Sequence, residues 1–435
     1  MTRIHIAGGR LIDPASGTDA TLDLYVADGR VAGIGQAPEG FRPDAMIDAA
    51  GRIVCPGFVD LRAHLREPGD EHKGTIASES RAAVRAGITT LCCPPDTRPP
   101  VDTPAVAGLI RRRARAAGGA RVVPLGALTR GLAGELLSEM AALRDAGCVG
   151  VSNGFHPVRD NIVMLRAMEY AATFDMPVFV NPQDHALAGD GRVHQGAVGS
   201  RLGISGIPAA AETVAVAAIL AMVDELGVRV HFSLLSTARA AQMIARAQHD
   251  GLPVTADVSA HHLHLSENDV LDFDALCHVQ PPLRTLRDRE GLRQWLTRGA
   301  ITAICSDHQP HEPDAKLRPF TETAPGISGL DTLLPLTLRL VDEGVISISD
   351  LVARLSWYPA RILGIPAGKL NIGQPADICV FDPESHWILG RDTIGSRGVN
   401  TPFLGWEMKG RVTHTLLSGR IVHERGNAGD ADQSV

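Results

Sequence analysis

The chain has 435 residues, of which 44% are apolar and 21% are charged, and its formal net charge is −7. This composition is typical of a globular protein, and the length suits one large domain with a smaller one. The net negative charge argues against a nucleic-acid partner. No apolar segment is long enough to span a membrane or to form the core of a signal peptide. We therefore expect a cytoplasmic protein without a membrane partner.

The N-terminal segment, residues 1–52, consists of short alternating stretches separated by glycine turns, as in IHIAGGRLID and TLDLYVADGRVAGIG. This pattern of short stretches between glycine turns predicts short β-strands. It returns in residues 366–424, for example in RVTHTLLSGRIVHERG. We expect the two segments to pair into one small composite β-sandwich domain, and the polar residues 425–435 to form a disordered tail.

Between these segments, eight short apolar runs alternate with helical stretches, among them 74–87, 103–118 and 209–227. Eight strand–helix units, without a glycine-rich phosphate loop after the first strand, favour an α/β fold with a TIM-type (β/α)8 barrel over residues 53–365. A doubly wound open sheet is the alternative. The predicted strands are 53–60, 88–93, 121–129, 148–153, 176–181, 228–235, 253–259 and 300–307.

The seven cysteines are odd in number, and most of them lie inside apolar runs. Cys92 and Cys93 are adjacent in one such run, and no CxxC pair occurs that would indicate a structural zinc site. We therefore predict reduced, buried thiols rather than disulfides.

In a TIM barrel the active site lies at the carboxyl ends of the barrel strands. The first strand leads into FVDLRAHLREPG, which holds Arg62, His64 and Arg66, and the eighth ends at Asp307 in SDHQPH. The intervening strands end near Asn153, Asn181 and Leu234.

Several longer motifs match one family in order and spacing, and the sequence resembles the dihydroorotases of the amidohydrolase superfamily along nearly its whole length. Hydantoinases and allantoinases, which share the barrel, match these stretches less well. The matching stretches are PGFVDLRAHLREPG, AGITTLCCPPDTRPPVDT, VTADVSAHHLHLSENDV, VQPPLR, SDHQPHEPDAK, PFTETAPGISGLDTLLPL and NTPFLGWEMKGRV.

The resemblance implies a zinc-dependent enzyme that opens or closes the dihydroorotate ring, with zinc held by histidines and acids at the strand ends. Only His64 and Asp307 keep ligand-type side chains, as vestigial metal ligands, and Asp307 is also the vestigial catalytic residue. Catalytic zinc normally has three protein ligands, so we expect no cofactor. The positions at which the ligand is lost are Arg62, Asn153 (placed to within one residue), Asn181 and Leu234.

Arg62 suggests a specific replacement for the metal, because its fixed positive charge would repel zinc and could instead pair with Asp307. On the substrate side, the resemblance makes Arg66, Asp96 and His311 remnants of the site that binds the substrate. Asp96 stands where the family has asparagine, which places an acid beside an anionic ligand.

The remaining histidines have two interpretations. His261, His262 and His264 lie in a family-typical AHHLHL run, which favours a scaffold role. His156 and His185 follow the fourth and fifth strands and could rebuild a metal site only by turning inward.

Three functions remain open. The first is a pseudoenzyme of pyrimidine biosynthesis, a non-catalytic, oligomeric subunit that supports the assembly and activity of aspartate carbamoyltransferase, a partner implied by the resemblance alone. The second is an active zinc-dependent dihydroorotase or related cyclic amidohydrolase with an altered site. The third is a small-molecule sensor that uses the vestigial pocket.

Overall fold

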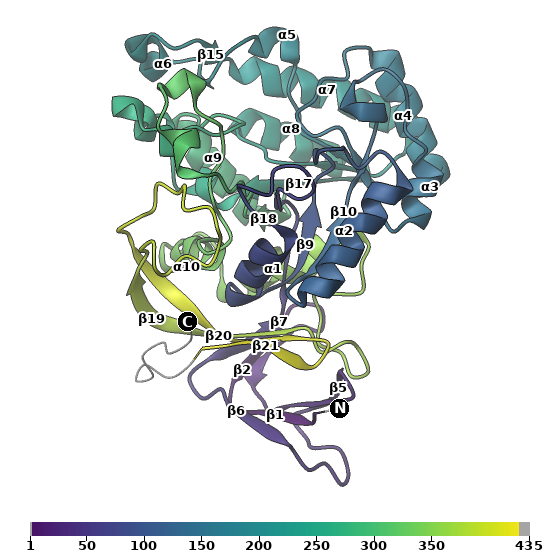
Figure 1. The fold of residues 1–435 in the computed structure, drawn as a ribbon, viewed down its shortest axis with the longest axis vertical. Helices are drawn as coiled ribbons and strands as arrows, with labels where there is room; N and C mark the ends of the chain where they lie inside the picture. Colours follow the sequence, from purple (N-terminus) through teal and green to yellow (C-terminus); the bar gives the residue numbers. More distant parts are fainter. Residues whose placement is uncertain (1, 426–435) are drawn as a thin grey trace.

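The computed structural model describes residues 2–425. It contains an α/β region with a β-sandwich beneath it (Figure 1). The predicted tail, except Arg425, lies outside the described residues. Within residues 2–425, no helix is both long and apolar enough to cross a membrane.

The strands of the α/β region follow one another in barrel order and are all parallel. Hydrogen bonding runs through two ladders, β8 to β10 and β11 to β18, and a single parallel bridge between Ala63 and His308 joins their outer ends. The strands are β8 (Phe58–Asp60), β9 (Ile88–Cys93), β10 (Arg121–Pro124), β11 (Gly126–Ala127), β12 (Val151–Ser152), β13 (Val178–Val180), β16 (Val230–Phe232), β17 (Val254–Ser259) and β18 (Ala303–Cys305).

Several of the predicted strands differ in detail. The stretch 121–129 is divided into β10 and β11, and only Val151 and Ser152 of 148–153 are in a strand. The run 53–60 is divided at Gly57, where a Cβ atom would overlap the side chain of Thr89. Its first half, β7 (Ile53–Pro56), pairs with the sandwich strands β2 and β19, although the domain boundary was predicted at residue 53.

The helices form where the sequence supplies a cap and an apolar face. Thr75 and Ser78 make a reciprocal capping box at the start of α1, and Ile76, Ala82 and Ala83 lie on its buried face. The longer helices are α1 (Ile76–Arg85), α2 (Pro104–Ala117), α4 (Asn161–Thr173), α7 (Ala209–Leu226), α8 (Ala238–His249), α9 (Leu286–Thr297) and α10 (Leu333–Asp342). The shorter ones are α3 (Met140–Asp145), α5 (His185–Ala188), α6 (Ala197–Leu202), α11 (Ile348–Val352) and α12 (Tyr358–Leu363).

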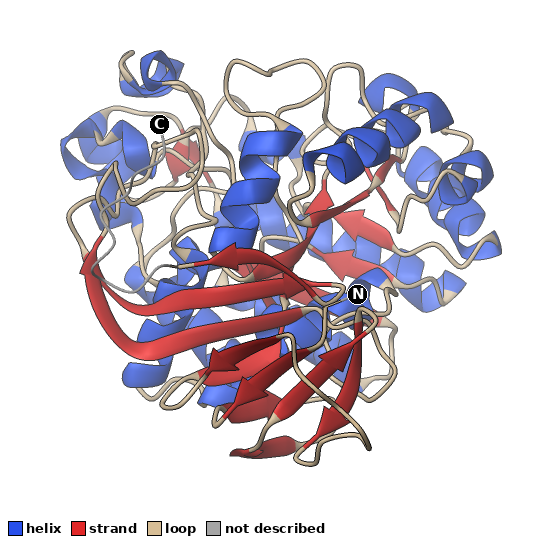
Figure 2. Ribbon diagram, turned by 60° about the horizontal axis from the view of Figure 1, so that its bottom comes forward, coloured by secondary structure: helices blue, strands red, loops and turns tan. Residues whose placement is uncertain are grey.

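The sandwich is composite. Its four-stranded sheet has the order β5-β4-β1-β6, and its six-stranded sheet, β21-β20-β19-β7-β2-β3, combines strands from both ends of the chain. In Figures 1 and 2 these strands lie together on one side of the molecule. Their bounds are β1 (Ile4–Ala7), β2 (Arg10–Asp13), β3 (Thr18–Thr21), β4 (Leu24–Ala27), β5 (Arg30–Ile34), β6 (Ala45–Asp48), β19 (Ile378–Ile388), β20 (Glu407–Leu417) and β21 (Arg420–Glu424). A short outlying pair, β14 (Val193–His194) and β15 (Gly206–Ile207), forms a further sheet.

Several apolar clusters follow from this arrangement, among them a sandwich core and a cluster inside the strand ring. The sandwich core joins Ile6 and Leu24 of the N-terminal segment to Ile378 and Leu416 of the C-terminal segment. The interior of the strand ring has its own cluster, which includes Val59, and all seven cysteines are buried as free thiols. The carboxyl ends of β8, β12, β13 and β18 are thereby held on a packed base, where Arg62, Asn153, Asn181 and Asp307 follow them.

Candidate functional site

An ion pair occupies the mouth of the strand ring. Arg62 Nε donates to Asp307 Oδ1 at 3.0 Å, and the two side chains are 6% and 1% exposed. Arg62 Nη1 also donates to Asn181 Oδ1 at 3.2 Å, and its guanidinium lies 5.4 Å from the centre of the Phe155 ring. Gln309 Nε2 donates to both oxygens of Asp307. The pairing of Arg62 with Asp307 that the sequence suggested is therefore present.

The burial of Asp307 has an electrostatic consequence. Burial raises its pKa to about 7, although Arg62 and Gln309 both favour the ionised form. The backbone here is also unusual, because φ is +62° at Arg66, +59° at Leu234 and +43° at Asp307. Left-handed conformations at non-glycine residues are uncommon, and they cluster at functional sites. The strand ends thus keep the backbone geometry of a functional site although side chains suited to metal binding are missing.

His64 is bound to Asp96 and not to Asp307. His64 Nε2 lies 3.0 Å from Asp96 Oδ2, while His64 Nδ1 and Asp96 Oδ1 have no partner among the described residues. Burial lowers the pKa of His64, and Asp96 opposes this change only in part. For Asp96 burial acts in the opposite direction, yet His64, Arg62 and Arg66 together hold its pKa well below the ordinary value. The carboxylate of Asp96 is therefore held in its ionised form by its basic neighbours.

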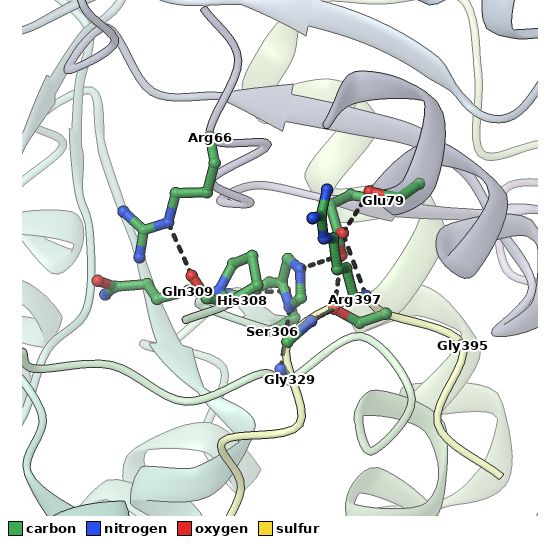
Figure 3. A network of polar contacts seen from close by, with 12 residues as sticks. Arg66, Glu79, Ser306, His308, Gln309, Gly329, Gly395 and Arg397 are labelled. Atoms are coloured by element: carbon green, nitrogen blue, oxygen red, sulfur yellow. Dashed lines mark hydrogen bonds and ion pairs between the residues drawn. The ribbon is translucent and has the colours of Figure 1, made fainter. Parts of the chain in front are cut away.

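Arg66 and His311, the two basic residues that the resemblance assigns to the substrate side, contact each other. Arg66 Nε donates to the carbonyl oxygen of Pro310 at 3.0 Å, a contact visible in Figure 3. His311 Nε2 lies 3.1 Å from Arg66 Nη2 and 3.0 Å from the carbonyl oxygen of Pro325, and it can serve only one of them at a time. Burial, aided by Arg66, lowers the pKa of His311 to about 2. The imidazole is therefore neutral and cannot supply a positive charge to an anion.

The other predicted positions do not point at this centre as ligands. Asn153 accepts from Thr129 Oγ1 at 2.7 Å and donates to the carbonyl oxygen of His156 at 3.1 Å, so its amide is engaged by its own loops. Leu234 is 2% exposed, and only its backbone takes part, donating to Asp257 Oδ1 at 2.7 Å. Asn153 and Leu234 thus stabilise the strand ends and contribute no donor to the centre.

A second buried network lies beside the centre, and sequence reasoning did not predict it (Figure 3). His308 Nδ1 accepts from the backbone N–H of Gly329, so the proton is on Nε2, which donates to Glu79 Oε2 at 2.9 Å. The hydroxyl of Ser396 donates to the same carboxylate oxygen. The network ties α1, the end of β18 and the C-terminal segment together. The feature of the sequence that could have predicted this network is an acidic residue, Glu79, on the buried face of α1.

The AHHLHL histidines behave as scaffold in the structure. His262 Nδ1 lies 2.7 Å from Ser259 Oγ, and His264 Nε2 donates to the carbonyl oxygen of Leu336 at 2.8 Å. Burial lowers the pKa of His262 to about 4 and that of His264 to about 3. His261 is 2% exposed and packs against His262, with ring centres 4.8 Å apart. None of the three contacts Arg62 or Asp307.

Comparison with known proteins agrees with this architecture. A family model described as dihydro-orotase-like matches residues 51–240. The chain is 51% identical over 421 residues to a dihydroorotase-like protein of Pseudomonas aeruginosa, and the match covers 97% of this chain and 99% of that protein. A dihydroorotase of Anaeromyxobacter dehalogenans is 44% identical over 427 residues, covering 98% and 99% of the two chains. The chain belongs to the dihydroorotase-like family of the amidohydrolase superfamily.

The fold of this dihydroorotase-like chain also matches solved structures. An L-hydantoinase (dihydropyrimidinase) from Arthrobacter aurescens superposes with a TM-score of 0.88 at 23% identity, covering 98% of this chain and 97% of that one. A D-hydantoinase gives a TM-score of 0.82 at 21% identity, covering 97% and 95%. These matches support an α/β TIM-barrel fold with a β-sandwich domain.

Zinc is the metal that the family implies, and the side chains at this centre do not fit it. His64 and Asp307 are the only two ligand-type side chains left from the predicted set, each already has a partner, and the guanidinium of Arg62 lies beside Asp307. Within residues 2–425, no group of three or more His, Cys, Asp or Glu side chains is placed to hold a metal ion. Three protein ligands are the usual minimum for catalytic zinc.

Proposed function

We propose that this dihydroorotase-like chain is a pseudoenzyme that needs no metal cofactor and does not hydrolyse dihydroorotate. The observation that carries the proposal is the position of Arg62, whose guanidinium is bonded to Asp307 and Asn181. A fixed cation in that position repels a divalent ion and uses the oxygens that would bind it. The pair also engages the carboxylate of Asp307, which is bonded to Arg62 and Gln309 and is therefore hindered from moving a proton.

We propose further that the chain acts in the cytoplasm as a subunit of a hetero-oligomer with aspartate carbamoyltransferase and supports the assembly and activity of that enzyme. The support is the sequence resemblance together with an intact fold, because a structural subunit needs a stable scaffold and a complementary surface but no metal. Relatives at 51% and 52% identity are named dihydroorotase-like protein, whereas relatives at 44% and 42% are named dihydroorotase.

The first test is zinc content by elemental analysis, on protein purified from cells supplied with zinc. An active dihydroorotase purified in parallel is the control. We expect less than about 0.1 equivalent of zinc per chain. One or two equivalents, together with hydrolysis of dihydroorotate, would refute the proposal and favour the second candidate, an active zinc-dependent dihydroorotase, which the names of the relatives at 44% identity support.

The second test concerns the partner. Tagged full-length chain is co-expressed with the aspartate carbamoyltransferase of the same organism, and the eluate is examined by size-exclusion chromatography with light scattering. We expect one complex of defined mass and a higher carbamoyltransferase activity than that of the enzyme alone. Separate elution with unchanged activity would rule out the proposed partner while leaving the absence of zinc unaffected.

A further inference from the structure

A cavity lies beside the Arg62 centre and not in it. It has a volume of about 630 Å³ and is enclosed by the loop after β12, by β13, and by α4, α5 and α7. Arg62, His64 and Asp307 do not line it. Cavities of about 300–1,000 Å³ are the usual size of small-molecule sites.

The walls of this cavity are largely apolar. Val178 and Val180 of β13 line it together with Ala215, Ala218 and Ile219 of α7. Helix α7 is apolar around most of its circumference, a pattern that usually indicates a helix buried on all sides.

Exposed apolar side chains lie at the cavity and on the helices around it. Val214 of α7 lines the cavity and is 45% exposed. Ile162 and Leu187, on the neighbouring helices α4 and α5, are 49% and 44% exposed. Apolar surface is therefore left uncovered where α4, α5 and α7 meet.

The polar groups of the cavity are mainly unused hydrogen-bond donors. The side chains of His156, Arg159 and His185 line it and make no hydrogen bond or ion pair with another described residue. Asn181 is 8% exposed, and its Nδ2 has no partner while its Oδ1 accepts from Arg62.

Three of the acceptor oxygens that line the same cavity are already engaged. Asp184 Oδ1 accepts from the backbone N–H of Leu187 at the start of α5, and Gln183 Oε1 accepts from Gln280. Asn153 Oδ1 accepts from Thr129. Donors without partners beside acceptors with partners suit a ligand that brings its own acceptor oxygens.

From this arrangement we infer a binding site for a small organic anion, a carboxylate or similar oxyanion on an apolar body, in the cavity between α4, α5 and α7. The apolar body lies against Val178, Ala215 and Ala218, and the oxyanion accepts from Arg159 and the nearby imidazoles. The cavity shares Asn181 with the Arg62 centre, since Asn181 Oδ1 accepts from Arg62, but Arg62, His64 and Asp307 do not line it.

The test uses 8-anilinonaphthalene-1-sulfonate, which combines an apolar body with an oxyanion and becomes fluorescent in apolar surroundings. Octanoate, octanol and octylamine, which share one tail and differ in the head group, then compete with it on the full-length chain. We expect one bound dye per chain, displaced by octanoate at a concentration at least about fivefold lower than octylamine requires. Equal displacement by octylamine would overturn the assignment to an anion.

Two tryptophan variants locate the binding. Ala218→Trp fills the apolar wall and should abolish dye fluorescence, whereas Ala217→Trp, on the exposed face of the same helix, should leave it unchanged. Fluorescence that is unchanged in Ala218→Trp, or lost equally in both, would overturn the location.

A charge variant keeps the test decisive if Ala218→Trp does not fold. Arg159 is exposed, and Arg159→Gln should weaken displacement by octanoate about fivefold without changing displacement by octanol. An unchanged response to octanoate would refute the role assigned to this cation.

Discussion

Replacing Arg62 by alanine is the perturbation whose outcome follows most directly from the structure. The substitution leaves Asp307, 1% exposed at its side chain, without its cation and removes a donor from Asn181. Removing one partner of a buried ion pair typically costs about 3–5 kcal/mol, because the other charge stays buried and uncompensated. The expected loss in the free energy of unfolding depends on whether Asp307 is ionised.

The pKa of Asp307 determines how the loss in the free energy of unfolding varies with pH. Burial raises it from the ordinary value of 3.8 to about 7, so between pH 4 and pH 7 the folded state binds a proton that the unfolded state has released. Stability therefore falls as pH rises through this window, by at most about 1.4 kcal/mol per pH unit. Without Arg62, which favours the ionised form, the pKa of Asp307 should rise further and the window should extend above pH 7.

The free energy lost by Arg62→Ala is consequently small in acid and large in base. At pH 6, where Asp307 is mainly protonated, we expect about 1–2 kcal/mol from lost hydrogen bonds. At pH 9 we expect about 3–5 kcal/mol, because the carboxylate must either stay ionised without a cation or bind a proton from alkaline solution. The sign of the change is destabilising at both values.

The assay is equilibrium urea unfolding at pH 6 and pH 9. Arg246→Ala is a matched control, because Arg246 pairs with Asp250 at 2.8 Å while its side chain is 75% exposed, and it should change the free energy by less than about 0.5 kcal/mol at either pH. The double variant Arg62→Ala/Asp307→Asn should recover most of the loss at pH 9. The reasoning is refuted if Arg62→Ala costs less than about 1 kcal/mol at pH 9, or costs the same at both pH values.

Three further outcomes are expected. Asp96→Asn should lower the free energy of unfolding by about 1–3 kcal/mol at pH 7. Because the pKa of Asp96 is lowered in the folded state, this difference should shrink below about pH 4. Urea unfolding of both proteins at pH 7 and pH 3 measures it. His308→Ala should lower the free energy of unfolding by about 2–4 kcal/mol, because it removes a donor from the buried carboxylate of Glu79 and leaves a cavity. Urea unfolding measures this loss as well, and a value below about 0.5 kcal/mol would contradict the role of the network. Arg62→His, which adds a third ligand to His64 and Asp307, should raise the zinc content towards one equivalent per chain by elemental analysis, whereas Arg62→Ala, which adds none, should leave it near zero; equal zinc in both variants would contradict the ligand count.

Much of the fold could be predicted from the sequence, because its signals are local. The alternation of apolar runs and helical stretches predicted the strands and the helices α1, α2 and α7, and the glycine turns at both ends of the chain predicted the sandwich strands. The division of one apolar run at Gly57 was not predicted, since it depends on how closely Thr89 of the next strand approaches.

The candidate site, like the fold, could be predicted from the sequence only in part. Residue identities alone showed that Arg62 and Leu234 cannot bind a metal and that Asp307 would need a cation. The partner of His64, however, is Asp96, and Asn153 is turned towards its own loop. A hydrogen bond between side chains on different strands depends on rotamer and strand register, which no local pattern encodes.

The sequence by itself determined which chemical groups stand at the strand ends, and therefore which metal ligands are missing. Only the tertiary structure decided which of those groups meet, because Arg62 and Asp307 are 245 positions apart and Glu79 and His308 are 229 apart. It also decided where the cavity lies, since a cavity is the space left when whole helices pack. The physical reason is that secondary structure follows from neighbours in the chain, whereas contacts and cavities follow from how distant elements fit together.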